Sequence, residues 1–90
     1  MMQVKYSVVV PVYNEEDSVM PLAESIRKTM AILNEPYEII FVNDGSTDKT
    51  PEWLEKLKES SVNLRVATLN KNSGQTASLK AGFDMAKVSL

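Results

Sequence analysis

The chain contains three short runs of mostly apolar residues, each bounded by polar segments. They are YSVVVPV at Tyr6–Val12, YEIIFV at Tyr37–Val42 and LRVATL at Leu64–Leu69. Runs of this length, rich in β-branched residues, are typical of strands that are covered on both faces of a parallel sheet. The sequence therefore predicts three strands at these positions.

A segment with helical features follows each run. From about Asp17 to Leu33, apolar residues recur every three or four positions, at Val19, Leu22, Ile26, Met30 and Leu33. Thr50 followed by Pro51 is typical of a helix start, with Thr50 as the capping residue. A third helix, rich in small residues, is predicted from Gln75 to about Lys87, with Gly82 permitting a close approach to the sheet. The residues of this helix expected to face the sheet are Ala77, Ala81 and Met85.

The resulting order, β-α-β-α-β-α, predicts a three-layer α/β fold with a parallel sheet and right-handed crossovers. A chain of 90 residues supports at most one modest domain. No repeat, linker or low-complexity tract divides it.

Composition excludes several classes of function. Lysine and arginine are scattered among aspartate and glutamate, and the formal net charge of −2 argues against a nucleic-acid surface. Because cysteine and histidine are absent, disulfides, zinc sites and histidine-dependent triads are excluded. The apolar runs are far shorter than the roughly 20 residues that a membrane-spanning helix requires.

Three polar loops should meet at the carboxyl ends of the strands, where ligands bind in open α/β sheets. They are VYNEE, NDGSTD and NKNSGQ, whereas the opposite loops, NEPY and ESSVN, are ordinary turns. The loops contain no glycine-rich phosphate motif, and a calcium loop beginning at Asp44 would place Lys49 where glycine is required. They offer instead the ring of Tyr13 and the acceptors Glu15 and Asp44, which suit a nucleobase and ribose. Lys71 would supply charge towards a phosphate.

Each of these features also has a plainer interpretation. NDGS is a common turn sequence, and Asp48 suits a capping or loop-ordering role. Glu16 and Asp17 would complement a helix dipole, and Asn72 and Ser73 could cap the third helix. The convergence of three such loops on one end of the sheet favours a binding site.

Taken together, the segments VVVPVYNEE, IIFVNDGSTDKT and NKNSGQTASLKAGFDMA resemble the opening of family-two glycosyltransferases with the GT-A fold. The resemblance covers essentially the whole chain, in the same order and spacing. The third segment is most similar to the branch that acts on polyprenyl phosphates, which includes dolichyl-phosphate mannose synthase and bacterial undecaprenyl-phosphate sugar transferases.

The resemblance implies a set of nucleotide-binding residues: Pro11, Tyr13, Glu15, Asp44, Lys71 and Gln75. Asp44 would contact the base, while Gln75 and Lys71 would lie near the diphosphate or the sugar. Asn43 departs mildly from the family, because many members carry there the first aspartate of an Asp-Asp-Gly-Ser sequence.

The implied reaction is transfer of a sugar from a nucleoside diphosphate sugar, by default UDP-linked, to a polyprenyl phosphate or a saccharide. In the family a divalent metal, Mg²⁺ or Mn²⁺, is held by an Asp-x-Asp motif and stabilises the leaving diphosphate. Because this chain stops at Leu90, before that motif, residues 1–90 are expected to be the N-terminal donor-binding part of a longer enzyme. We expect the chain alone to bind no metal and to have negligible transferase activity. The expected location is cytoplasmic, with the longer enzyme at the cytoplasmic face of the membrane.

The expected strand order is 3-2-1, which makes the first strand an edge. An exposed apolar edge is a template for pairing with another chain, so we expect self-association through residues 6–12. Three interpretations stay open at this point: the donor-binding part of a glycosyltransferase, a non-catalytic nucleotide-binding module, and a structural association domain.

Overall fold

The computed structural model describes residues 3–87, in which strands and helices alternate as the sequence predicts. The elements are β1 (Tyr6–Val12), α1 (Val19–Leu33), β2 (Tyr37–Asp44), α2 (Thr50–Ser60), β3 (Leu64–Leu69) and α3 (Gln75–Met85). The first and third strands have the predicted bounds, and β2 continues through Asn43 to Asp44. The end of β2 therefore carries the predicted base-contacting residue.

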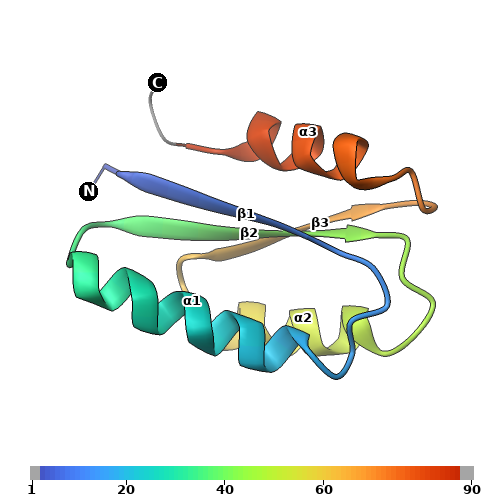
Figure 1. The fold of residues 1–90 in the computed structure, drawn as a ribbon, viewed down its shortest axis with the longest axis horizontal. Coiled ribbons are helices and arrows are strands. Elements are labelled where there is room, and N and C mark those ends of the chain that lie inside the picture. The colour runs from blue at the N-terminus through green and yellow to red at the C-terminus, as the bar shows by residue number, and fades with distance from the viewer. Residues whose placement is uncertain (1–2, 88–90) are drawn as a thin grey trace.

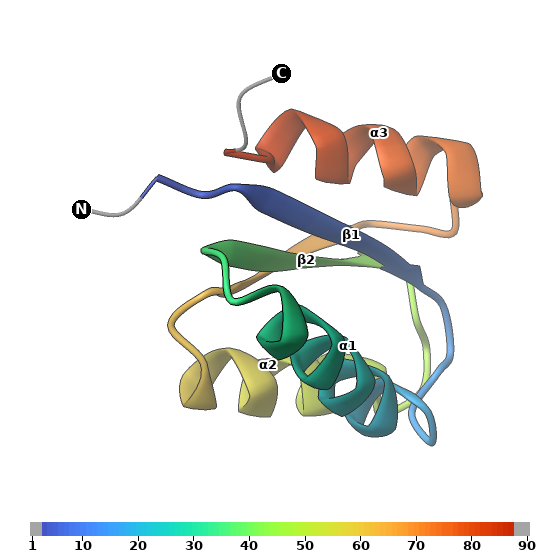
Figure 2. The ribbon, with the colours of Figure 1, turned by 60° about the vertical axis from the view of Figure 1, so that its left-hand side comes forward.

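The strands form one parallel sheet in the order β1-β2-β3, with β2 in the centre (Figure 1). Tyr6 is opposite Tyr37 in the first pair of strands, and Ile39 is opposite Leu64 in the second. Helices α1 and α2 cover one face of the sheet and α3 covers the other (Figure 2). The predicted strand order 3-2-1 and the three-layer arrangement are confirmed.

The main core lies between the sheet and the α1–α2 layer. Its buried residues are Val12, Val19, Ala23, Ile39, Phe41, Leu54, Leu57 and Leu64. Two members of the predicted apolar stripe of α1 do not join it, because Leu22 is 37% exposed and Leu33 is 46% exposed. The buried stripe of α1 is therefore narrower than the spacing of its apolar residues suggested, and Leu22 and Leu33 lie at the margin of this stripe.

Small residues bring α3 close to the opposite face of the sheet. Gly82 is buried, and a Cβ added there would lie 2.2 Å from Cγ1 of Val9, so the predicted close approach is confirmed. Ser78 is also buried, whereas Ala77 and Ala81 are half-buried. The face turned to the sheet is therefore centred on Ser78 and Gly82 rather than on the two predicted alanines.

The start of α2 differs from the prediction. Thr50 Oγ1 accepts a hydrogen bond of 2.9 Å from the backbone N–H of Glu15, so this hydroxyl does not cap its own helix. Asp48 Oδ1 instead accepts a hydrogen bond of 2.9 Å from the backbone N–H of Thr50. Asp48 therefore has the predicted loop-ordering role, and Thr50 connects α2 to the loop after β1.

Within residues 3–87, no helix combines the length and the apolar character needed to cross a bilayer.

Candidate functional site: a cleft at the carboxyl ends of the strands

A cleft of about 360 Å³ opens where the three polar loops meet. It is lined by Pro11, Val12, Tyr13, Glu15, Asp44, Asn72, Gly74, Gln75 and Ser78. Every predicted site residue other than Lys71 is among them. Lys71 is exposed and lies outside the lining, although its loop supplies the adjacent Asn72. The structure thus brings together residues from the end of β1, the end of β2 and the start of α3.

The β1 side of the cleft is formed by the last residues of the strand and the loop that follows. Proline is tolerated at position 11 because β1 is an edge strand, where a missing backbone donor breaks no ladder bond. Tyr13 follows directly after the strand and is 41% exposed, so part of its ring is available to a ligand. Glu15 is exposed as well, and its carboxylate makes no hydrogen bond among those found in the described part of the chain.

Asp44 forms the opposite side of the cleft and fixes the third loop. Its carboxylate is buried, and its two oxygens accept hydrogen bonds of 2.7 Å from the backbone N–H of Ser73 and 3.0 Å from that of Gly74. An ionised carboxylate has about four acceptor positions, so each oxygen retains capacity for one more donor. Asp44 can therefore hold the start of α3 and accept a ligand donor at the same time.

The loop after β1 is joined to the loop after β2 by hydrogen bonds that the sequence did not reveal. The backbone N–H of Asn14 donates to Ser46 Oγ at 2.9 Å, and Asn14 Oδ1 accepts from the backbone N–H of Thr47 at 2.8 Å. The backbone N–H of Glu16 donates to Asp48 Oδ2 at 3.2 Å. The two loops therefore form one connected unit. The only sequence signal was the clustering of Asn, Ser, Thr and Asp in both loops.

The carboxylate of Asp48 is ionised more readily than usual. Its burial would raise the pKa, but hydrogen bonds from Thr50 and from the backbone of Glu16 outweigh that effect and lower the pKa of Asp48 below its ordinary value. The charged form therefore accepts the bond from Glu16 that connects the two loops and the bond from Thr50 at the start of α2.

The acidic groups of the described residues do not form a metal site. No group of three or more aspartate or glutamate side chains that could hold an ion occurs within residues 3–87. The donor set of this part of the chain does not fit the divalent cation that the family resemblance implies, and we derive no step through a metal.

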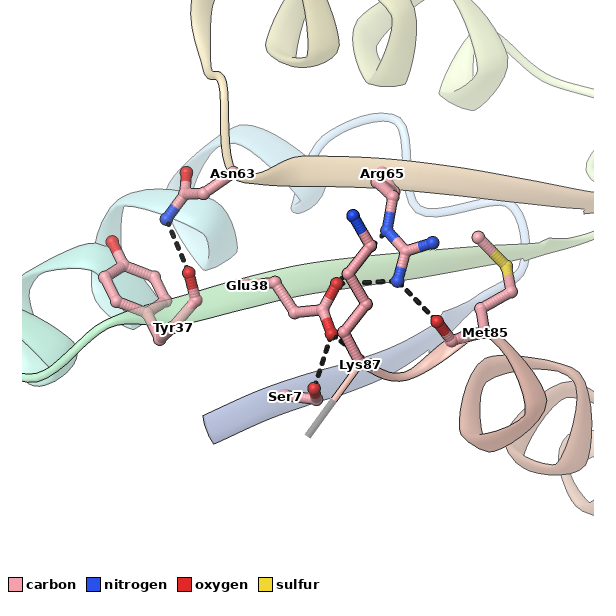
Figure 3. A network of polar contacts seen from close by, with 7 residues as sticks. All are labelled: Ser7, Tyr37, Glu38, Asn63, Arg65, Met85 and Lys87. Atoms are coloured by element: carbon pink, nitrogen blue, oxygen red, sulfur yellow. Dashed lines mark hydrogen bonds and ion pairs between the residues drawn. The ribbon is translucent and has the colours of Figure 1, made fainter. Parts of the chain in front are cut away.

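A larger cavity, of about 750 Å³, lies at the opposite end of the sheet, where the sequence indicated only ordinary turns. Its lining includes Tyr37, Glu38 and Arg65. Glu38 is buried and accepts hydrogen bonds from Ser7 Oγ at 2.6 Å, Arg65 Nη2 at 2.6 Å and the backbone N–H of Lys87 at 2.7 Å (Figure 3). Two ionisable residues that line this cavity, Glu38 and Arg65, already form an ion pair with each other.

This network secures the C-terminal end of α3. Arg65 Nη2 also donates to the backbone carbonyl of Met85, the last residue of the helix (Figure 3). Burial would raise the pKa of Glu38, but hydrogen bonds from Ser7, Lys87 and Arg65, with the positive charge of Arg65, lower it below its ordinary value. Glu38 is thus a structural anion that holds α3 against the sheet.

Comparison with known proteins connects this architecture to a family. Among curated relatives, an undecaprenyl-phosphate 4-deoxy-4-formamido-L-arabinose transferase from Proteus mirabilis is 43% identical over 83 residues, which is 91% of this chain and 26% of the relative. A dodecaprenyl-phosphate galacturonate synthase from Rhizobium johnstonii is 43% identical over 82 residues, covering 90% of this chain and 24% of the relative. The predicted similarity to polyprenyl-phosphate sugar transferases is confirmed.

The fold has a counterpart of known structure. TarS 1-349 of S. aureus, in complex with UDP, aligns with a TM-score of 0.77 and 32% identity, over 94% of this chain and 25% of the TarS chain. The chain thus spans about a quarter of the length of these relatives. A family model described as glycosyl transferase family 2 matches residues 7–89. With this match over nearly its whole length, the chain belongs to glycosyl transferase family 2.

Proposed function

We propose that this chain binds the nucleoside diphosphate of a sugar donor and is the donor-recognition part of a glycosyltransferase. The observation that carries the proposal is that Tyr13 and Glu15, from the loop after β1, and Asp44, from the end of β2, line one cleft. An aromatic ring can stack on a base, and carboxylates can accept hydrogen bonds from base N–H groups and ribose hydroxyls. A binding site with one flat apolar surface and a few polar groups suits a nucleoside.

We further propose that the base is uracil. Each oxygen of Asp44 already accepts one backbone N–H, from Ser73 or from Gly74. Each oxygen keeps one acceptor position, and the single imide N–H of uracil needs only one of them. The 32% identity to TarS, whose structure contains UDP, supports the same assignment.

The diphosphate and the sugar would lie towards the start of α3. The helix begins at Gln75 after Gly74, and among the described residues no side chain caps its first turn. Free N–H groups at a helix N-terminus attract anions, and the exposed Lys71 adds a positive charge on the neighbouring loop. Gln75 and Lys71 therefore keep the roles that the family resemblance implied, as part of this proposal.

For the longer enzyme we propose transfer of the sugar to a polyprenyl phosphate. Two relatives carry names that include undecaprenyl phosphate or dodecaprenyl phosphate, and each is 43% identical to this chain. A phosphate acceptor is already an anion, so a strong general base is less necessary than for a hydroxyl acceptor. We assign the reaction to the cytoplasmic face of a membrane, with a divalent metal held by residues outside this chain. The 90-residue chain alone should show negligible transfer in a radiolabelled sugar assay.

Calorimetric titration of the chain with UDP, GDP and AMP tests the proposal. We expect saturable UDP binding, weaker GDP binding, and a loss of roughly tenfold in affinity for Tyr13→Ala, because stacking on an aromatic side chain contributes about 1–3 kcal/mol per base. Tyr6→Ala is the matched control, since both tyrosines are 41% exposed and Tyr6 lies at the other end of β1. Absence of UDP binding, or equal effects of the two substitutions, would refute the proposal and favour a structural association domain.

A further inference from the structure

Asn14 lies between two residues of the cleft but does not line it. Its backbone is left-handed, with φ of 51°, a conformation in which asparagine is enriched among residues other than glycine. The left-handed turn allows Tyr13 and Glu15, on either side of it, to line the same cleft. The side chain of Asn14 is directed to the loop after β2 instead.

Asn14 makes a reciprocal pair of hydrogen bonds with that loop. Its backbone N–H donates to Ser46 Oγ at 2.9 Å, and its Oδ1 accepts from the backbone N–H of Thr47 at 2.8 Å. Because the two partners are adjacent in the sequence, both the main chain and the side chain of Asn14 are fixed to one short stretch.

The remaining connections of the first loop, to the loop after β2 and to the start of α2, do not depend on side chains of the first loop. The N–H of Glu15 donates to Thr50 Oγ1, and the N–H of Glu16 donates to Asp48 Oδ2. Both donors belong to the backbone. Among the hydrogen bonds found between these loops in the described residues, Asn14 therefore contributes the one side chain from the β1 side.

The stretch that holds Asn14 is itself anchored to the core. The backbone N–H of Ser46 donates to Oδ1 of Asn43 at 3.0 Å, and Asn43 is buried at the end of the central strand. Asn14 is thus connected through Ser46 to β2, the strand that also supplies Asp44. This connection sets the position of Tyr13 and Glu15 relative to Asp44.

We propose that Asn14 is a positioning residue for nucleotide binding: its side chain orders the loop after β1 so that Tyr13 and Glu15 face Asp44 before the ligand arrives. This inference rests on the proposed nucleotide-binding function. A loop that is already ordered avoids part of the entropy loss on binding, so its affinity is higher for the same contacts. The substitution Asn14→Ala removes the acceptor for Thr47 without altering any group that lines the cleft.

The test compares wild type, Asn14→Ala, Asn14→Asp and the control Asn34→Ala in the full chain. Asn34 is the other described non-glycine residue with positive φ, at 52°, and lies after α1 at the opposite end of the sheet. Both alanine variants lose a residue suited to the left-handed conformation, so a general loss of stability should affect both. Asn14→Asp retains an acceptor oxygen and the tolerance for positive φ.

Two quantities are measured: the Kd for UDP by calorimetry, and amide hydrogen exchange of Thr47 in the absence of nucleotide. We expect Asn14→Ala to exchange faster at Thr47 and to bind UDP roughly tenfold more weakly, equivalent to about 1.4 kcal/mol. Asn14→Asp should keep most of the wild-type affinity for UDP and most of the protection of the Thr47 amide. Asn34→Ala should leave the Kd unchanged.

The outcomes separate this inference from the proposed function. If the wild-type chain binds UDP and Asn14→Ala binds it equally well, or if Asn34→Ala weakens binding to the same extent, the positioning role is refuted. If the wild-type chain binds no UDP, the proposed function is refuted instead. In that case, faster exchange at Thr47 in Asn14→Ala would show that the connection is purely structural.

Discussion

The carboxylate of Asp44 accepts a hydrogen bond of 3.0 Å from the backbone N–H of Gly74, the residue directly before α3. Its other oxygen accepts one of 2.7 Å from the backbone N–H of Ser73. The end of the central strand thereby fixes the start of α3, which lines the same cleft. Asp44 combines a structural role with a position at the proposed base site.

The first prediction concerns this pair of bonds. Asp44→Ala should lower the free energy of unfolding by about 3 kcal/mol, because hydrogen bonds to a charged acceptor contribute about 1.5–3 kcal/mol each. The N–H of Ser73 loses its partner, and the N–H of Gly74 keeps only Asn72 Oδ1, at 3.1 Å. Asp44→Asn retains one acceptor oxygen, so its free energy of unfolding should fall by less. Urea unfolding followed by circular dichroism measures both. Equal losses for the two variants would contradict a contribution from the remaining bond.

The second prediction concerns the contact between Gly45 and the loop after β3. Gly45 has φ of +73°, and a Cβ added there would lie 2.5 Å from the carbonyl carbon of Lys71. The loops after β2 and β3 are therefore packed backbone to backbone at this point. Gly45→Ala should cost about 3 kcal/mol or more, because a left-handed conformation costs roughly 1–2 kcal/mol and the clash with main-chain atoms adds to it.

Gly74→Ala is the matched control for Gly45→Ala. Gly74 also has positive φ, at +91°, but a Cβ added there would meet nothing within 4 Å. Its substitution should therefore cost only the backbone strain, about 1–3 kcal/mol, because φ of 91° with ψ of 162° is a conformation essentially restricted to glycine. Thermal unfolding of both variants measures the difference, and an equal cost would show that the Gly45–Lys71 contact relaxes without loss.

The third prediction concerns the packing of α3 on β1. Gly82→Ala would place a methyl group 2.2 Å from Cγ1 of Val9 and should destabilise the protein by about 1–3 kcal/mol. Val9→Ala removes that methyl group and leaves room for the new one. A double-mutant cycle on the unfolding free energy should therefore give a favourable coupling between Gly82→Ala and Val9→Ala. Simple additivity would mean that the helix moves away from the sheet instead.

The strands and the order of the layers were predictable from sequence because both depend on local patterns. The apolar runs Tyr6–Val12 and Leu64–Leu69 coincide with β1 and β3, since nearly every residue of a strand covered on both faces must be apolar. The alternation of strands and helices then dictates a parallel sheet. The convergence of the three polar loops follows directly from that topology.

The inward faces of the helices were predicted less well, because periodicity gives a stripe but not its width or its exact centre. Leu22 and Leu33 follow the spacing of α1 and are nevertheless exposed. On α3, the close approach to β1 requires glycine at position 82, since a Cβ there would clash with Val9, and the buried Ser78 donates its hydroxyl to the carbonyl of Gly74. These choices are made by tertiary packing.

The contacts that hold the site together could not be read from the chain. Asn14 bonds to Thr47, and Thr50 bonds to Glu15, because the segments that follow the paired strands β1 and β2 lie side by side. Thr50 was assigned by local pattern to its own helix, but its hydroxyl accepts from the other loop. Side chains that serve a distant backbone give no periodic signal.

The fourth prediction is a loss of stability in acid through Glu38. The pKa of this carboxyl is lowered in the folded protein from a reference value of 4.5. The stabilisation it provides is therefore complete above the unfolded pKa and is lost as the pH falls through the lower, folded pKa. Urea midpoints measured from about pH 7 to about pH 3 should fall below roughly pH 4.5.

The variant Glu38→Gln tests whether Glu38 causes this dependence of the urea midpoint on pH, that is, the slope of the midpoint against pH. Because glutamine does not titrate, the variant should show a lower midpoint at neutral pH, where Arg65 lacks its partner, and a flatter dependence in acid. Some slope should remain, since the pKa of Asp48 is lowered too and acts in the same direction. An unchanged slope in Glu38→Gln would show that the network around Glu38 does not control acid unfolding.

The fifth prediction is self-association through β1, which is an edge strand of the sheet that residues 3–87 form. The N–H of Tyr6 donates to the carbonyl of Pro36, next to β2, so alternation along the strand directs the N–H groups of residues 7 and 9 to the open edge. Pro11 follows in that series and has no N–H, so pairing is blocked near the cleft. A second copy is therefore expected to pair with the first half of β1.

The flank of α1 beside this edge provides apolar surface for the same contact. Arg27 donates to Ser61 at the end of α2, which identifies the flank of α1 that faces α2. By the helical period of about 3.6 residues per turn, Leu22 and Leu33 lie on the other flank. They are 37% and 46% exposed. A second copy that pairs with β1 would cover both leucines, and charged residues beside an edge strand oppose such pairing.

Sedimentation velocity over increasing protein concentration should accordingly show wild-type dimers, and the double variant Leu22→Lys, Leu33→Lys should remain monomeric. Ile32→Lys is the control, because Ile32 is on the same helix and is already 84% exposed. Its charge would stay in solvent whether or not two edges meet, so dimerisation should persist. A wild-type chain that is monomeric at every concentration would refute pairing through β1, and loss of the dimer in Ile32→Lys would assign it to a different surface.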